Sequence, residues 1–125
     1  MKQAITSERA PASIGVYSQA IKIGNVVYLS GQIPLDPASK ELIQGDIAEQ
    51  VVRVFENLKA VAEAAGGNLD SIVKVGVYLI DLADFPVVND TMKKYFKQPY
   101  PARTTIGVTA LPKNALVEVD AIMVV

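Results

Sequence analysis

Arg103, Glu118 and Asp120 are the residues of this chain whose types and spacing best fit a catalytic or binding site. The segment 100–108 is expected to be a strand, and the segment 116–122, with alternating polarity, is expected to pair with it as a hairpin. Such a hairpin would direct one guanidinium and two carboxylates away from the core, and it would put Arg103, Thr105 and Glu118 on one uncovered face of the sheet. A guanidinium suits a substrate carboxylate, and a nearby carboxylate could activate water or move a proton. The alternative is that these charged residues have no function beyond a solvated surface or a cross-strand ion pair. The pattern alone favours this alternative.

The composition narrows the chemistry that this chain could perform. It contains no cysteine and no histidine. Disulfides, thiolate nucleophiles, Ser-His-Asp catalysis and metal sites built from Cys or His are therefore excluded. Catalysis would have to use carboxylates, Arg, Lys, Tyr, hydroxyls or backbone groups. We expect no metal and no cofactor.

Length and charge indicate one domain over residues 1–125 without a nucleic-acid or membrane partner. Half of the residues are apolar, and an excess at this size is typical of chains whose surface is partly covered by other subunits. A net charge of −1 provides no basic field for nucleic acid. There is no apolar run of membrane-spanning length and no apolar core of a signal peptide at the start, so we expect a cytoplasmic location.

The periodicity predicts an α+β fold in the order β-β-β-α-β-α-β-β. One mixed or antiparallel sheet would carry both helices on one face. We expect neighbouring subunits to cover its other face. Asp46 and Asp84 are the predicted helix N-caps, and Gly66-Gly67 should end the first helix. The predicted elements are strands at 1–6, 20–23, 26–30, 71–80, 100–108 and 116–122, and helices that begin after Asp46 and Asp84. The strand 71–80 is apolar on both faces and should be central.

Two further positions are candidates for a site beside the predicted hairpin. Gly31, after Ser30, lacks a side chain where the backbone could approach another group, although a plain bulge or strand exit explains Ser30-Gly31 equally well. Asn89 lies at the edge of the apolar stripe of the second helix, where a surface asparagine is the default interpretation.

Several short segments of the chain match the pattern of one known family, in order and spacing. They are APASIGVYSQA at 10–20, SGQIP at 30–34, NLKAV at 57–61, DF at 84–85 with VN at 88–89, PARTT at 101–105, LPK at 111–113 and VEVDA at 117–121. PARTT is the most specific of them. Through these segments the chain resembles, along essentially its whole length, the RidA (YjgF-type) family of reactive-intermediate deaminases.

The resemblance implies a chorismate-mutase-like fold assembled as a homotrimer with clefts between subunits. It also implies hydrolysis of 2-imino acids and their enamine tautomers, such as 2-iminobutanoate and 2-iminopropanoate, to 2-oxo acids and ammonia. Pyridoxal-phosphate-dependent dehydratases would release these substrates. By similarity, Arg103 would hold the substrate carboxylate and Glu118 would activate water. The pocket would be lined by Tyr17, Ser30, Gly31, Asn89, Arg103, Thr105 and Ile106.

One position departs from the family pattern, since many members carry cysteine where this chain has Thr105. Thiol chemistry is therefore excluded at this position. We expect the change from cysteine to threonine to affect the polarity of the pocket and the substrate preference. In the predicted hairpin, Arg103 lies about four to six residues along the ladder from Glu118, or roughly 13–20 Å. That span is too long for one small imino acid. We therefore expect a composite site, with Arg103 from one subunit and Glu118 from its neighbour.

The sequence is also compatible with other functions. One is a small-ligand-binding or holdase-like module without turnover, which would need neither Arg103 nor Glu118. A ribonuclease or translation inhibitor is disfavoured by the lack of histidine and of a basic stripe. Deamination of 2-aminomuconate is a related enzymatic alternative. The preferred imino acid and the partner dehydratase are not determined by the residues.

Overall fold

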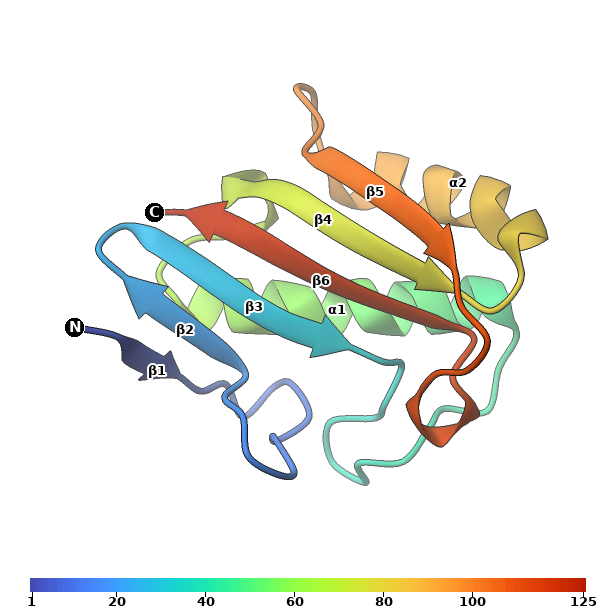
Figure 1. Ribbon diagram of the computed structural model, residues 1–125, viewed down its shortest axis with the longest axis horizontal. Helices are drawn as coiled ribbons and strands as arrows, with labels where there is room; N and C mark the ends of the chain where they lie inside the picture. Colours follow the sequence, from blue (N-terminus) through green and yellow to red (C-terminus); the bar gives the residue numbers. More distant parts are fainter.

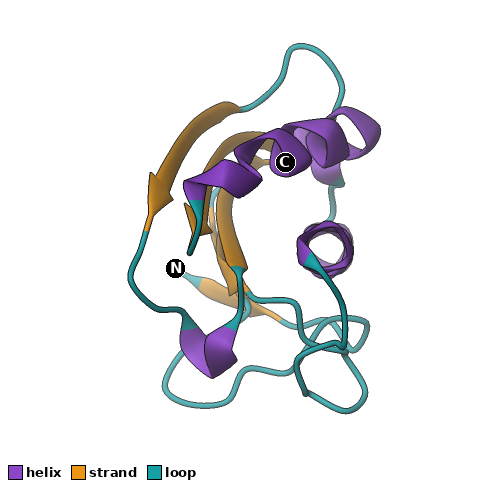
Figure 2. Cartoon of the chain, turned by 90° about the vertical axis from the view of Figure 1, so that its right-hand side faces the viewer, coloured by secondary structure: helices purple, strands orange, loops and turns teal.

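A six-stranded mixed sheet covered on one side by two helices is the framework of the molecule (Figures 1 and 2). The computed structural model describes residues 1–125, and it confirms the predicted α+β fold and the order of the main elements. The strands are β1 (Gln3–Ile5), β2 (Ala20–Ile23), β3 (Val26–Gln32), β4 (Ile72–Leu79), β5 (Ala102–Gly107) and β6 (Val117–Val124). The helices are α1 (Ile47–Ala64) and α2 (Phe85–Tyr95), with 3₁₀ turns η1 (Leu69–Ser71), η2 (Leu82–Asp84) and η3 (Pro112–Asn114).

The predicted hairpin between the last two strands is wrong. The strand order is β1-β2-β3-β6-β4-β5, so β4 lies between β5 and β6. Helix α2 carries the chain back to the starting end of β4, and β5 therefore pairs with β4 in parallel. The connection to β6 then crosses the end of β4, where Val108 N–H donates to the Leu79 carbonyl and Ile80 N–H donates to the Leu116 carbonyl.

Helix α1 begins and ends as the sequence predicts. The Asp46 carboxylate accepts a hydrogen bond of 3.0 Å from Glu49 N–H. At the other end Gly66 adopts φ +94°, and Gly67 N–H donates to the Ala62 carbonyl at 3.1 Å. This left-handed glycine cap stops the helix. Its apolar stripe packs on the sheet, with the buried side chains Val51, Val54, Phe55, Leu58 and Val61.

Helix α2 begins after Asp84, as predicted, but without the capping bond of a usual N-cap. Asp84 occupies the N-cap position in the right-handed helical region, and its side chain makes no capping hydrogen bond. The chain enters through η2, and the Asp81 carboxylate caps that turn by accepting from Ala83 N–H at 2.9 Å. Pro86 lies in the first turn of the helix, where no backbone donor is needed.

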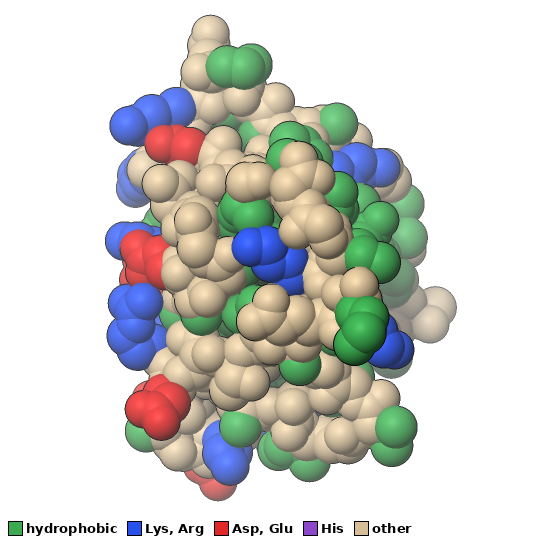
Figure 3. Space-filling view, turned by 90° about the vertical axis from the view of Figure 1, so that its left-hand side faces the viewer, with side chains coloured by type: hydrophobic (Ala, Val, Ile, Leu, Met, Phe, Trp, Pro, Cys, Tyr) green, Lys and Arg blue, Asp and Glu red, His purple; other side chains and the backbone are tan.

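The face of the sheet away from the helices is uncovered within one chain; we call it the open face. Along β4, Val75, Val77 and Leu79 are buried under the helices, whereas Gly76 and Tyr78 are half-exposed on the open face. The open face also carries exposed apolar side chains, among them Tyr28, Ile106 and Val124. Figure 3 shows hydrophobic side chains gathered on the sheet side, at the right of the view, and charged side chains along the left. Neither helix of the structure has the length and apolarity needed to cross a membrane.

Candidate functional site

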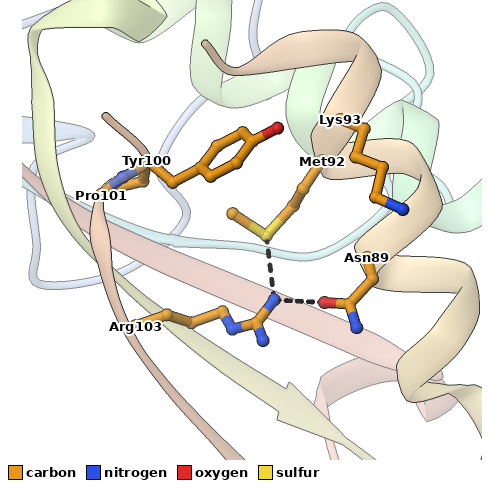
Figure 4. Close-up of a pocket in the computed structure, with 6 residues that line it drawn as sticks. All are labelled: Asn89, Met92, Lys93, Tyr100, Pro101 and Arg103. Carbon is orange, nitrogen blue, oxygen red and sulfur yellow. Dashed lines mark hydrogen bonds between the residues drawn. The ribbon is translucent and has the colours of Figure 1, made fainter. Parts of the chain in front are cut away.

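Arg103 lies on β5 with its side chain turned toward helix α2. Its parallel partner in the sheet is the buried Val75, and partners in a ladder share a face. Its Nη1 donates to Asn89 Oδ1 at 2.6 Å and lies 3.5 Å from the Met92 sulfur (Figure 4). The guanidinium carbon is 4.7 Å from the centre of the Phe85 ring. Three groups of α2 therefore hold the guanidinium in one place.

A pocket of about 370 Å³ opens in front of this guanidinium. Its lining contains two cations and no carboxylate: Asn89, Met92, Lys93, Tyr100, Pro101 and Arg103 (Figure 4). Neither cation belongs to an ion pair, because the pairs of the structure are Arg9–Glu63 and Lys97–Asp70. An unpaired, braced guanidinium in a concave site is suited to binding a carboxylate ligand.

Glu118 lies on the other face of the sheet. Its antiparallel partner is Tyr78, and its side chain is half-buried on the open face. Burial raises the pKa of the Glu118 carboxyl, and the negative charge of Asp120 raises that pKa further. A Cβ added at Gly31 would collide with the Glu118 carboxylate, so the glycine leaves the space that this carboxylate occupies. A carboxylate whose pKa is raised is a stronger base than an ordinary carboxylate, which suits it to accept and return a proton.

The prediction that Arg103, Thr105 and Glu118 share the uncovered face is wrong. Arg103 and Thr105 face the helices, because their β4 partners Val75 and Val77 are buried there. In register, Glu118 is level with Tyr78, which is level with Ile106, three residues beyond Arg103. The sheet spacings place the two backbones roughly 14 Å apart. Within one chain the two side chains thus lie on opposite faces.

The remaining predicted site residues are distributed around these two groups. Ser30 and Gly31 form a bulge opposite β6, where the register shifts between Leu29 and Gln32. Ser30 Oγ donates to the Ser18 carbonyl at 2.6 Å, which ties β3 to the loop that carries the exposed Tyr17. Tyr17 lines a separate hollow together with Ser18.

Thr105 and Ile106 point to opposite sides of β5. Ile106 is 44% exposed on the open face. Thr105 is half-buried on the helix side, and its buried hydroxyl oxygen has no hydrogen-bond partner. The sequence is compatible with Asn89 as either a surface residue or a site residue. In the structure Asn89 accepts a hydrogen bond from Arg103.

Sequence reasoning missed several residues of the two sites. Phe85 and Met92 belong to the apolar stripe of α2, and they also contact Arg103. Their spacing around Asn89 on one helical stripe was the available signal. The pattern of segment 71–80 predicts a strand that is apolar on both faces, so it gives no signal for Tyr78. The Tyr78 hydroxyl nevertheless donates to Asp120 Oδ2 at 3.0 Å.

Comparisons with known proteins agree with this architecture. Residues 7–125 match the family model described as Endoribonuclease L-PSP. A RutC family protein of Pyrococcus abyssi is 50% identical over 121 residues, which cover 97% of this chain and 95% of that protein. A protein of Dermatophagoides farinae named 2-iminobutanoate/2-iminopropanoate deaminase is 46% identical over 124 residues, covering 99% of this chain and 97% of that protein.

Solved structures give the same assignment. The crystal structure of RidA from the Antarctic bacterium Psychrobacter sp. PAMC 21119 superimposes with a TM-score of 0.95 at 48% identity. The match covers 98% of this chain and 99% of the other. The fold is therefore the chorismate-mutase-like fold of these structures. From sequence, family model and structure alike, this chain belongs to the RidA (YjgF-type) family.

Proposed function

We propose that this protein hydrolyses 2-imino acids and their enamine tautomers, such as 2-iminobutanoate and 2-iminopropanoate, to 2-oxo acids and ammonia. The observation that carries the proposal is the Arg103 guanidinium, which is braced by Asn89 and faces a pocket without a carboxylate. The relative named 2-iminobutanoate/2-iminopropanoate deaminase supports the same substrate class.

In this mechanism Arg103 binds the substrate carboxylate and fixes the imine carbon relative to a water molecule. The reaction starts from the protonated imine. Glu118 accepts one proton from that water as its oxygen bonds to the carbon, and the π pair of the C=N bond moves to nitrogen. Glu118 then gives this proton to the nitrogen, and the C–N bond breaks with its electron pair on the departing ammonia. The hydroxyl proton passes to the Glu118 carboxylate and from there to solvent, which leaves the oxo group. No step calls for a cofactor or a metal.

The site is proposed to form between subunits of a homotrimer, with Arg103 from one chain and Glu118 from its neighbour. The positions of the two side chains on opposite faces of one sheet support this arrangement. The exposed apolar side chains of the open face, such as Tyr28 and Ile106, support its burial by other subunits.

Other residues have supporting roles in the proposal. Asn89 orients Arg103, and Gly31 makes room for Glu118. Tyr17, Ser30, Thr105 and Ile106 would line the cleft once subunits assemble. Pyridoxal-phosphate-dependent dehydratases acting on serine or threonine would supply the substrate, in the cytoplasm.

The first test measures release of 2-oxo acid from threonine by such a dehydratase, with and without this protein. The wild type should accelerate release, and Arg103→Ala should not. Acceleration that survives in Arg103→Ala would keep the activity and refute the carboxylate clamp. No acceleration by a correctly folded oligomer would instead support a binding module without turnover.

A second test addresses the composite site. Arg103→Ala and Glu118→Ala chains are each expected to be inactive alone. Refolded together, they would form mixed trimers in which some clefts contain both native residues, so activity should return. A mixture as inactive as its parents would place both residues of a working site in one chain.

The ribonuclease activity implied by the description of the family model has less support. The chain has no histidine and a net charge of −1. Cleavage and binding of RNA usually rely on an acid–base pair and a basic surface.

A further inference from the structure

Three polar side chains form a cluster on the open face, and only Glu118 has a role in the proposed reaction. Glu118 and Asp120 lie two residues apart on β6, on the same face. Tyr78 of β4 is level with Glu118 in the ladder, and its hydroxyl donates to Asp120 Oδ2 at 3.0 Å. Tyr78 thus reaches diagonally over Gly76, the ladder partner of Asp120, to hold the second carboxylate.

Glycine provides the space for this arrangement. Gly76 is the ladder partner of Asp120. A Cβ added at Gly76 would collide with Asp120 Oδ1 and would lie 3.0 Å from the Tyr78 hydroxyl. Gly31 leaves space for the Glu118 carboxylate on the opposite side in the same way. Both carboxylates are therefore seated against glycines of the flanking strands.

The charges of the cluster act on one another. The Asp120 charge raises the pKa of Glu118, in addition to the larger effect of burial. The hydrogen bond to Asp120 raises the pKa of Tyr78, with smaller contributions from burial and from the two carboxylates, so the tyrosine remains a donor at neutral pH. On this face of the two strands beside β6, the other titratable groups are Lys74 of β4 and Tyr28 of β3, both level with Ile122 rather than with Glu118. In the proposed composite site, Arg103 of the neighbouring chain also faces Glu118.

We propose that Tyr78 and Asp120 are a positioning pair for Glu118, in which Tyr78 fixes the Asp120 carboxylate beside the carboxyl group that handles the proton. The inference rests on the proposed function. A negative charge held in place beside Glu118 favours its protonated form, which must return the proton to the departing nitrogen. Without the tyrosine hydroxyl, the Asp120 carboxylate is free to turn toward water, and its effect on Glu118 weakens.

The test is the pH profile of kcat/KM for Asp120→Asn, Tyr78→Phe and the double variant. The acidic limb, where Glu118 becomes protonated, should move to lower pH in Asp120→Asn. It should move less in Tyr78→Phe. Tyr78→Phe should add nothing once Asp120 is changed, because the two residues act as one unit. Asp70→Asn, which removes an exposed carboxylate from another part of the molecule, should leave the profile unchanged.

A direct readout separates this inference from the proposed function. Titration of the Glu118 carboxyl by carbon-13 NMR, identified with Glu118→Gln, reports its pKa whether or not the protein turns over imines. The pair would be supported if the Glu118 pKa falls in Asp120→Asn while the fold stays intact. It would also require that Tyr78→Phe causes no further change in the Glu118 pKa when Asp120 is already asparagine. An unmoved Glu118 pKa, or additive effects of the two changes, would overturn it. Absence of deaminase activity in the wild type refutes the proposed reaction instead.

Discussion

Asn89 accepts a 2.6 Å hydrogen bond from Arg103, which links helix α2 to the edge strand β5. A long arginine on an exposed edge strand would otherwise sample many rotamers, and this bond, with the Phe85 ring beside it, selects one. The substrate carboxylate would then meet an oriented guanidinium.

Asn89→Ala should therefore weaken substrate binding more than it affects chemistry. Loss of one hydrogen bond to a charged group costs about 1.5–3 kcal/mol, so kcat/KM should fall by roughly 10- to 150-fold, mainly through KM. Steady-state kinetics measures the effect. Asn25→Ala is the matched control, because Asn25 is an exposed residue in the β2–β3 turn. A fall in kcat with KM unchanged would contradict the orienting role.

Gly31→Ala should impair catalysis while the protein remains folded. The added methyl group would displace the Glu118 carboxylate, and misplacement of a proton-transfer group reduces kcat by on the order of 100-fold. Thermal unfolding and activity are measured together. Gly107→Ala is the control, since its methyl group would meet only the Leu82 side chain, at 3.2 Å. Full activity of Gly31→Ala would show that Glu118 has another place to lie.

Lys93 should contribute to attraction of the anionic substrate, because it lines the pocket beside Arg103 without a carboxylate partner. Lys93→Gln should lower kcat/KM several-fold at low salt, and the difference should shrink as ionic strength rises. Lys94→Gln removes the same charge from the next residue, which does not line this pocket. Equal effects of the two changes would indicate net charge rather than the pocket.

Tyr95 should make the fold sensitive to alkaline pH. Burial, together with the hydrogen bond to Glu56, raises its pKa from 10.0 to about 12. The unfolded chain loses this proton first, so its contribution to stability is complete below about pH 10 and is lost as pH rises toward about 12. Tyr95→Phe should flatten the fall in Tm over this range, whereas Tyr28→Phe should not. If Tm falls as steeply with pH in Tyr95→Phe as in the wild type, other titrating groups cause the alkaline loss of stability.

Replacing the aspartate before each helix with alanine should affect the stability of the protein differently at the two positions. Asp46→Ala removes the bond to Glu49 N–H and should cost about 0.5–2 kcal/mol of unfolding free energy. Asp84→Ala removes no capping bond and should have little effect. Chemical denaturation measures both. Equal losses would mean that Asp84 acts through the helix dipole instead.

Local pattern was enough to predict the order of the helices and strands of this protein. The Asp46 cap and the glycine end of α1 depend on the backbone preferences of a few neighbouring residues, so the local sequence is enough to predict them. The absence of Cys and His limited the chemistry, and the segments around Arg103 and Glu118 indicated the family.

Only the tertiary structure decided how the strands are ordered and which faces the charges occupy. Residues 100–122 have the pattern of a hairpin, but insertion of β4 between β5 and β6 depends on pairing with distant strands and on the path of α2. That insertion puts Arg103 under α2 and Glu118 on the open face. It also brings Tyr78, 42 residues away in sequence, against Asp120. Alternation along a strand defines two faces, whereas packing against helices decides which of them is buried.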